Sequence, residues 1–192
     1  MLLDLLKKSS LFHLLHKIDL DLAEEVRLKG CAHCGGRLDY ARYKRRPCGG
    51  PDGLADQLCV RHSLCCDECR RRTLPPSCLF FGRRVYWGAV VVLVCALRQG
   101  RGGSVSVRRL QELFDVHHST VWRWMQYFRE YFPETPVWQR LKGRLRADVD
   151  ADELPGAILE LLVGKYGPSI EALKRLMVLI SAPHFAGSVM DI

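Results

Sequence analysis

Two Cys-x-x-Cys pairs carry the clearest chemistry in this sequence. The first is Cys31 and Cys34 in "CAHCGG", and the second is Cys66 and Cys69 in "CCDECRRR". Each pair places two thiolates at the separation that a tetrahedral Zn²⁺ ion requires, and two pairs complete a closed site of four sulfur ligands. We therefore predict a structural Zn²⁺ site formed by these four cysteines.

The register of the second pair stays open, because Cys65 lies next to Cys66 and either thiol could be the ligand. The unused thiol should point to the other face of its strand. A redox enzyme is the alternative chemistry for a Cys-x-x-Cys pair, but it needs one such motif that opens a helix after a strand. Here two motifs are present, followed by glycines or arginines, so the pattern favours a metal.

The other cysteines bear on the location of the protein. The chain has nine cysteines, and its apolar start "MLLDLLKKSS" lacks the charged leader and cleavage site of an export signal. We expect a cytoplasmic location, in which cysteine pairs bind metals rather than form disulfides. Cys48 and Cys59 could form a second site with His33 or His62.

Length and composition are those of an ordinary globular protein. The 192 residues are 48% hydrophobic and 26% charged, enough for one compact domain or two small ones. The longest apolar run, Val85 to Leu97, is shorter than the roughly 20 residues of a membrane span, and arginines flank it. This run predicts a buried helix and no membrane insertion.

The positive charge is concentrated in one region. The net charge is +8, but residues 27–109 alone hold 17 Lys and Arg against 5 Asp and Glu. Such a concentration suggests a polyanion partner, because neutralising phosphates releases counterions and supplies affinity. A solvated basic surface that serves solubility is the alternative.

A helix-turn-helix is predicted in "SVRRLQELFDVHHSTVWRWMQYF". Its first helix covers 107–114, and the second is capped near His117 with a buried stripe of Val121, Trp124, Met125 and Phe128. The N-terminal half of a recognition helix reaches base edges, and an arginine there can contact guanine. The alternative is a helical hairpin without a ligand. The predicted DNA-binding residues are Arg70, Arg71, Arg72, Arg108, Arg109, His118, Ser119, Thr120, Trp122 and Arg123.

The elements that position these residues indicate an α+β fold that is mostly α. We expect helical pieces over 2–18 and 19–30, strands within 37–47, 57–66 and 73–81, a helix over 83–100 and two C-terminal helices within 155–181. The predicted order is an N-terminal helical lead-in (1–30), a zinc ribbon (31–82), a helix-turn-helix (83–132) and C-terminal helices (133–192).

These motifs, in this order, are similar to a region of a known protein family. A ribbon "CAHCGG…CCDECRRRT" followed by an apolar helix and "STVWRWMQYFR" resembles the N-terminal DNA-binding region of zinc-ribbon insertion-sequence transposases, over roughly residues 31–132. The resemblance implies a DNA-reading module that precedes an RNase-H-like domain with acidic metal ligands.

The chain departs from that pattern in its C-terminal part. The stretch "RADVDADELPG" offers Asp148, Asp150, Asp152 and Glu153, but only about 40 mostly helical residues follow it. Acidic residues capping a helix that begins at Pro155 are the simpler interpretation. We therefore predict no catalysis.

The predicted function is that of a zinc-stabilised protein that binds double-stranded DNA, as an accessory or regulatory protein of a mobile element associated with the bacterial nucleoid. Two alternatives stay open. One is an adaptor whose N- and C-terminal helices bind a protein partner while the ribbon grips nucleic acid nonspecifically, and the other is a truncated transposase. The oligomeric state is left open.

Overall fold

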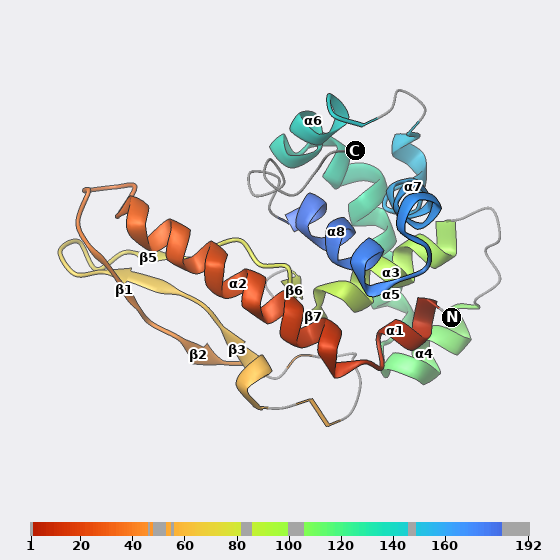
Figure 1. Cartoon of the computed structure of the whole chain (residues 1–192), viewed down its shortest axis with the longest axis horizontal. Helices are drawn as coiled ribbons and strands as arrows, with labels where there is room; N and C mark the ends of the chain where they lie inside the picture. Colours follow the sequence, from red (N-terminus) through yellow and green to blue (C-terminus); the bar gives the residue numbers. More distant parts are fainter. Residues whose placement is uncertain are drawn as a thin grey trace.

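The computed structural model describes residues 2–45, 47, 53–54, 56–81, 86–99, 106–145 and 149–181. Within these ranges the fold is α+β and mostly helical, with small antiparallel sheets. Figure 1 shows a body of helices at one end of the long axis and a narrow extension at the other. We call the extension the β-arm; it comprises the described part of residues 31–75, and the long helix α2 lies along it.

Helix α2 (Ser9–Lys29) links the body to the β-arm and follows the short helix α1 (Leu2–Leu5). It ends at Gly30, whose φ of 75° suits a residue without a side chain. We expected helical pieces over 2–18 and 19–30. In the structure the first helix instead ends at Leu5, and α2 begins at Ser9 and continues unbroken through Asp19. The polar stretch at Asp19 does not break it, because the Asp19 carboxylate bonds another segment instead of its own backbone.

The β-arm contains two small antiparallel sheets in one continuous register. Strands β1 (Leu38–Tyr40), β4 (Leu64–Cys66) and β5 (Arg72–Thr73) form a sheet in the order β1-β4-β5. Strand β2 (Tyr43–Lys44) pairs with β3 (Val60–Arg61), which follows the 3₁₀ turn η1 (Asp56–Cys59). Tyr40 lies opposite Leu64 and Tyr43 opposite Arg61, so the two sheets keep the same offset.

The third predicted strand is corrected by the structure. Only Arg72–Thr73 joins the cysteine sheet, whereas β6 (Phe80–Phe81) pairs with β7 (Tyr86–Trp87). Phe80 and Trp87 stack with ring centroids 5.5 Å apart, and both are buried in the core of the body. The aromatic side chains therefore draw this segment into the helical core and away from the arm.

Helix α3 (Gly88–Gln99) is the central helix of the body, and every side chain from Ala89 to Ala96 is buried. This confirms the predicted buried helix from Gly88 onward. Tyr86 and Trp87, which we placed in the helix, form strand β7 instead, and Val85 and Gly100 lie outside the described residues. Within the described ranges, none of the helices is both long and apolar enough to cross a membrane.

The remaining helices surround α3 (Figure 1). The predicted pair of helices within 155–181 is present. A further helix that the sequence did not predict, α6 (Pro136–Lys142), begins at Pro136, because proline is well suited to the first position of a helix. The elements are α4 (Val107–Phe114), α5 (His118–Gln126), the π-helical turn η2 (Tyr127–Tyr131), the 3₁₀ turn η3 (Phe132–Glu134), α6 (Pro136–Lys142), the 3₁₀ turn η4 (Ala151–Glu153), α7 (Gly156–Tyr166) and α8 (Ile170–Ser181).

Candidate metal centre and basic surfaces

The four predicted cysteines come together at the end of the β-arm that lies away from the body. Their sulfur atoms all lie within 4.8 Å of one another, with 3.7 Å between Cys31 and Cys69 and 3.4 Å between Cys34 and Cys66. Sulfur atoms around a tetrahedral Zn²⁺ are about 3.8 Å apart, because each Zn–S bond is about 2.3 Å long. All four are free thiols, so the cluster has the composition and spacing of a metal site.

The backbone builds the two halves of this cluster in the same way. The residue after each Cys-x-x-Cys pair has a positive φ, 76° at Gly35 and 60° at Arg70. The Cys31 N–H donates to the Gly36 carbonyl at 2.9 Å, and in the second turn the Cys66 N–H donates to the Arg71 carbonyl at 3.0 Å. Both thiol pairs are therefore held on tight turns that the adjacent strands anchor.

The electrostatics of the cluster favour binding of a cation. Backbone N–H groups of His33 and Cys34 hold the pKa of the Cys31 thiol down to about 6. At Cys34 the N–H of Gly36 acts in the same direction, but contacts with neighbouring thiols outweigh it and raise the pKa to about 12. The Cys31 thiolate therefore forms readily while Cys34 keeps its proton, and a divalent cation would release that proton.

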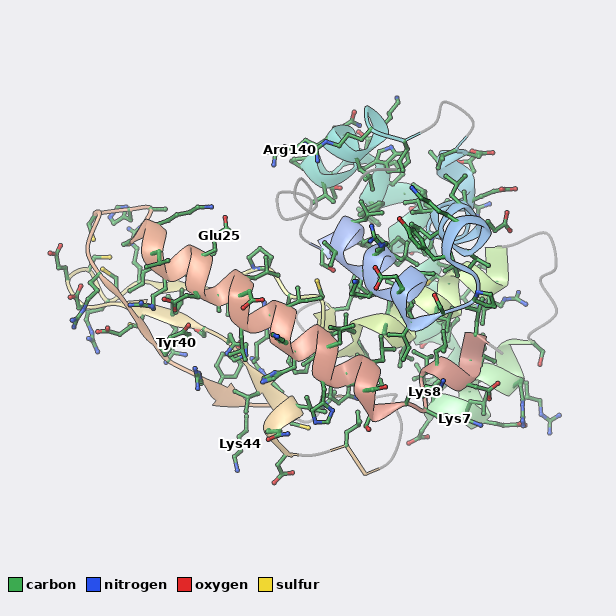
Figure 2. The ribbon with its side chains drawn as sticks, viewed as in Figure 1. Lys7, Lys8, Glu25, Tyr40, Lys44 and Arg140 are labelled. Atoms are coloured by element: carbon green, nitrogen blue, oxygen red, sulfur yellow. The ribbon has the colours of Figure 1, made fainter. Side chains whose placement is uncertain are left out.

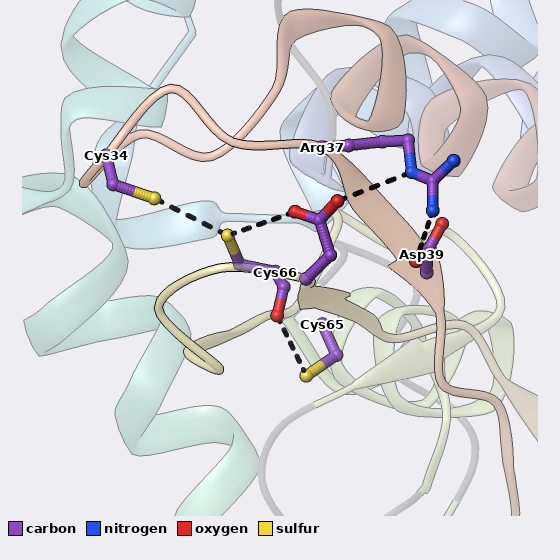
Figure 3. Close-up of polar contacts among 6 residues, drawn as sticks. Cys34, Arg37, Asp39, Cys65 and Cys66 are labelled. Atoms are coloured by element: carbon purple, nitrogen blue, oxygen red, sulfur yellow. Dashed lines mark hydrogen bonds and ion pairs between the residues drawn. The ribbon is translucent and has the colours of Figure 1, made fainter.

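The structure decides between the two adjacent cysteines. Cys66 is buried in the cluster, and the Cys65 thiol points away from it toward the carbonyl of Cys66 (Figure 3). The same thiol also lies near the carbonyl of Arg70. On the outer side of the cluster, Arg37 pairs with Asp39 at 3.3 Å and with Asp67 at 3.5 Å. The alternation of side chains along β4 thus places Cys66, and not Cys65, among the sulfur atoms.

The second metal site that we considered is not formed by the described residues. Among them, the four-cysteine cluster is the one place where at least three Cys, His, Asp or Glu side chains converge. Cys48 lies outside the described residues, and His62 is buried with both ring nitrogens lacking a hydrogen-bond partner. Sequence reasoning missed what surrounds His62, a cavity between α2 and the β-arm.

Helices α4 and α5 follow the predicted boundaries closely. The Ser106 hydroxyl accepts the Arg109 N–H at the start of α4, and the His117 ring accepts the Ser119 N–H at the start of α5. Asp115, in the left-handed conformation, makes the turn between them. Val121, Trp124 and Phe128 are buried and Met125 is half-buried, so α5 has the amphipathic face that the sequence predicted.

Nine of the ten predicted DNA-binding residues lie on the surface, and Thr120 is the exception. Its side chain is only 8% exposed, and its hydroxyl accepts a hydrogen bond from the Arg123 guanidinium at 3.1 Å. The same guanidinium donates to the Ser119 carbonyl at 3.2 Å, so Arg123 lies back along its own helix. Thr120 therefore supports Arg123 instead of facing a partner. The exposed residues are Arg70, Arg71, Arg72, Arg108, Arg109, His118, Ser119, Trp122 and Arg123.

The exposed residues form two separate surfaces. Arg70, Arg71 and Arg72 follow the second cysteine pair and lead into β5, whereas α4 and α5 lie at the other end of the long axis (Figure 1). Arg108 and Arg109 both pair with Glu112, at 3.3 and 3.6 Å.

A short acidic segment borders the α5 surface. Asp152 lines a cavity of about 440 Å³ together with Trp122, Arg123 and Arg129. We expected the acidic residues to cap a helix beginning at Pro155, but the Asp150 carboxylate instead accepts the Asp152 N–H at 2.9 Å and caps the turn η4. Asp148 lies outside the described residues.

Comparison of this chain with protein-family models, with curated proteins and with solved structures finds no match.

Proposed function

We propose that this chain is a zinc-stabilised protein that binds double-stranded DNA through α5. The observation that carries the proposal is the division of α5 into two faces. Val121 and Trp124 anchor the helix in the core, while His118, Trp122 and Arg123 are exposed on its N-terminal half. A recognition helix presents base-reading residues in this way, after a turn of the same short length.

Three further features support the proposal. The positive charge of residues 27–109 suits a phosphate backbone. The exposed arginines 70–72 sit directly after a rigid cysteine turn, where they would meet phosphates. The resemblance to the DNA-reading region of insertion-sequence transposases points the same way, and we propose an accessory role in a mobile element without catalysis of its own.

Zinc is the metal that we propose for the cysteine cluster, because four thiolates in tetrahedral spacing suit Zn²⁺. The metal would then contribute folding free energy to the β-arm. Metal analysis of the purified protein should give one Zn per chain. A strong chelator should change the far-UV and near-UV circular dichroism, and unchanged spectra would remove the claim.

The test of DNA binding is fluorescence anisotropy of the zinc-loaded protein on a random duplex pool and on DNA from its genomic neighbourhood, across a salt series. We expect selective binding that survives about 150 mM salt. Arg123→Ala should cost at least about tenfold in affinity for the selected sequence, the value of one good base contact. Lys142→Ala removes an exposed charge from α6 and serves as the control.

The same assay distinguishes the adaptor alternative. In that case DNA binding would be weak and unselective. Arg123→Ala would leave the affinity unchanged, whereas Arg70→Ala combined with Arg71→Ala would weaken it. This result would mean that the β-arm binds polyanions nonspecifically and that α5 does not read DNA.

A further inference from the structure

A second candidate site lies between α2 and the strands of the β-arm. It is a cavity of about 370 Å³, and none of the described residues that line it belongs to the cysteine cluster or to α5. His16 and Leu20 of α2 form one wall, and Arg42, Lys44 and His62 form the opposite wall. Figure 2 shows Lys44 extending from the strand into solvent, at the outer rim of this region.

The register of the arm explains why these side chains share one wall. Tyr40 pairs with Leu64 and Tyr43 with Arg61, so Arg42 lies opposite His62 between the two paired stretches. Side chains alternate along a strand, and therefore Arg42 and Lys44 share the face on which Tyr40 meets α2. On that face the Tyr40 hydroxyl donates to Glu24 at 2.8 Å.

His62 is the most informative residue of the cavity. It is only 2% exposed, yet neither ring nitrogen has a hydrogen-bond partner among the described residues. The ring of His16 lies nearby, with centroids 5.3 Å apart, and its buried Nδ1 also lacks a partner. Buried polar groups are nearly always hydrogen-bonded, so three unpartnered nitrogens at one cavity indicate a ligand position.

The charges around the cavity select the kind of ligand. No acidic side chain is among the described residues that line it, whereas Arg42 and Lys44 are both exposed at its edge. Burial, followed by the charges of His16, Arg42 and Arg61, lowers the pKa of His62 to about 4. The ring is therefore neutral at pH 7 and offers one N–H donor, and its cationic surroundings disfavour a metal cation.

We propose that this cavity binds a phosphate group, with Arg42 and Lys44 supplying the charge and the imidazoles of His16 and His62 supplying N–H donors. Phosphate oxygens accept several hydrogen bonds at once, and an arginine fork matches them. The phosphate could come from a small phosphorylated molecule or from a nucleic-acid backbone. This inference does not depend on DNA reading by α5.

The test is a titration of the zinc-loaded full chain with inorganic phosphate, then with adenosine monophosphate, followed by calorimetry and by NMR of the histidine rings. We expect the His16 and His62 ring signals to shift with added phosphate, while His118 on α5 stays constant. Arg42→Gln should weaken phosphate binding about tenfold, as expected for loss of a charged hydrogen bond.

Arg45→Gln provides a matched control. Arg45 lies over the ring of Tyr43 as Arg42 lies over the ring of Tyr40, at 4.2 and 4.6 Å from the ring centroids. It belongs to the same arm but does not line the cavity, so its replacement should leave phosphate affinity unchanged within about twofold. Equal losses in the two variants would mean nonspecific charge attraction and would overturn the proposal.

A parallel measurement of duplex DNA binding by the same variants identifies the source of the phosphate. If Arg42→Gln weakens phosphate and mononucleotide binding but not duplex binding, the site takes a small phosphorylated molecule. If it also weakens binding to all duplexes alike and makes the salt dependence shallower, the site takes backbone phosphates. Unmoved His62 signals with every probe would overturn the proposal whatever α5 binds.

Discussion

The carboxylate of Asp19 on α2 accepts the backbone N–H of Cys78 at 2.6 Å, and the two residues lie 59 positions apart in the chain. The same carboxylate accepts the Leu79 N–H at 3.3 Å and the Ser77 hydroxyl. Asp19 is 1% exposed, so a buried acid connects the helix that carries the β-arm to the segment that enters the helical core. This contact helps to fix the arm relative to the body.

Asp19 should make stability depend on pH in an unusual direction. Burial raises the pKa of its carboxyl from 3.8 to about 6, against the opposing effect of its hydrogen bonds. Between these two values the folded state binds the proton more tightly, so this group's contribution to stability should fall as the pH rises from about 4 to 6. The difference amounts to about 3 kcal/mol, at 1.36 kcal/mol per pKa unit.

Asp19→Asn isolates this effect, because asparagine keeps the oxygen acceptor but cannot ionise. The free energy of unfolding should be measured with denaturant on the zinc-loaded proteins at pH 4.5 and pH 7. Relative to the variant, the wild type should be more stable at pH 4.5 than at pH 7. Loss of metal in acid affects both proteins alike and cancels in the comparison. Asp21→Asn, at an exposed position of the same helix, is the control. Parallel pH profiles for wild-type and Asp19→Asn would contradict the assignment.

The adjacent cysteines of β4 offer a second prediction. Cys66→Ser should lower metal affinity by more than about 100-fold, beyond the 10–100-fold cost of losing a residue that only supports a ligand. Cys65→Ser should retain full metal content, since its thiol points away from the cluster. Metal competition with a chromophoric chelator measures both. Equal losses in the two variants would mean that the ligand is not fixed by the strand.

The sequence predicted most accurately the features that short-range interactions determine. Each Cys-x-x-Cys turn is local, and the caps at Ser106 and His117 lie within three residues of the N–H groups that they bind. Long-range contacts were not predictable in this way. The hydrogen bonding of the Asp19 carboxylate depends on Cys78, which lies far away in the chain. The cavity at His62 depends on the strand register that places Arg42 opposite His62.

Burial also removes one predicted DNA-binding residue from the exposed face of α5. Thr120 belongs to the N-terminal half of α5, where a recognition helix contacts bases, but the packing of α5 turns it toward the core. Its neighbours Ser119 and Trp122 stay exposed. A one-residue difference in helix phase separates the two outcomes, and a sequence pattern alone does not fix that phase to one residue.

The cavity that Asp152 shares with Arg123 and Arg129 leads to a third prediction, which rests on DNA binding by α5. The exposed Asp152 carboxylate places a negative charge beside the face that would meet phosphates. Asp152→Asn should therefore raise DNA affinity about two- to threefold at low salt, consistent with the weak interaction of exposed charges. The cap of η4 should survive, because it uses the Asp152 backbone N–H.

A control substitution at a distant position and the salt dependence of binding distinguish this local effect from a change in net charge. Glu160→Gln on α7 removes the same charge from an exposed site elsewhere on the body and should leave affinity nearly unchanged. The gain from Asp152→Asn should shrink as salt rises, since screening shortens to about 8 Å at 0.15 M. Anisotropy titrations at several salt concentrations measure both variants. An equal gain in the two variants would show that Asp152 acts only through net charge, and that α5 is not the surface that meets DNA.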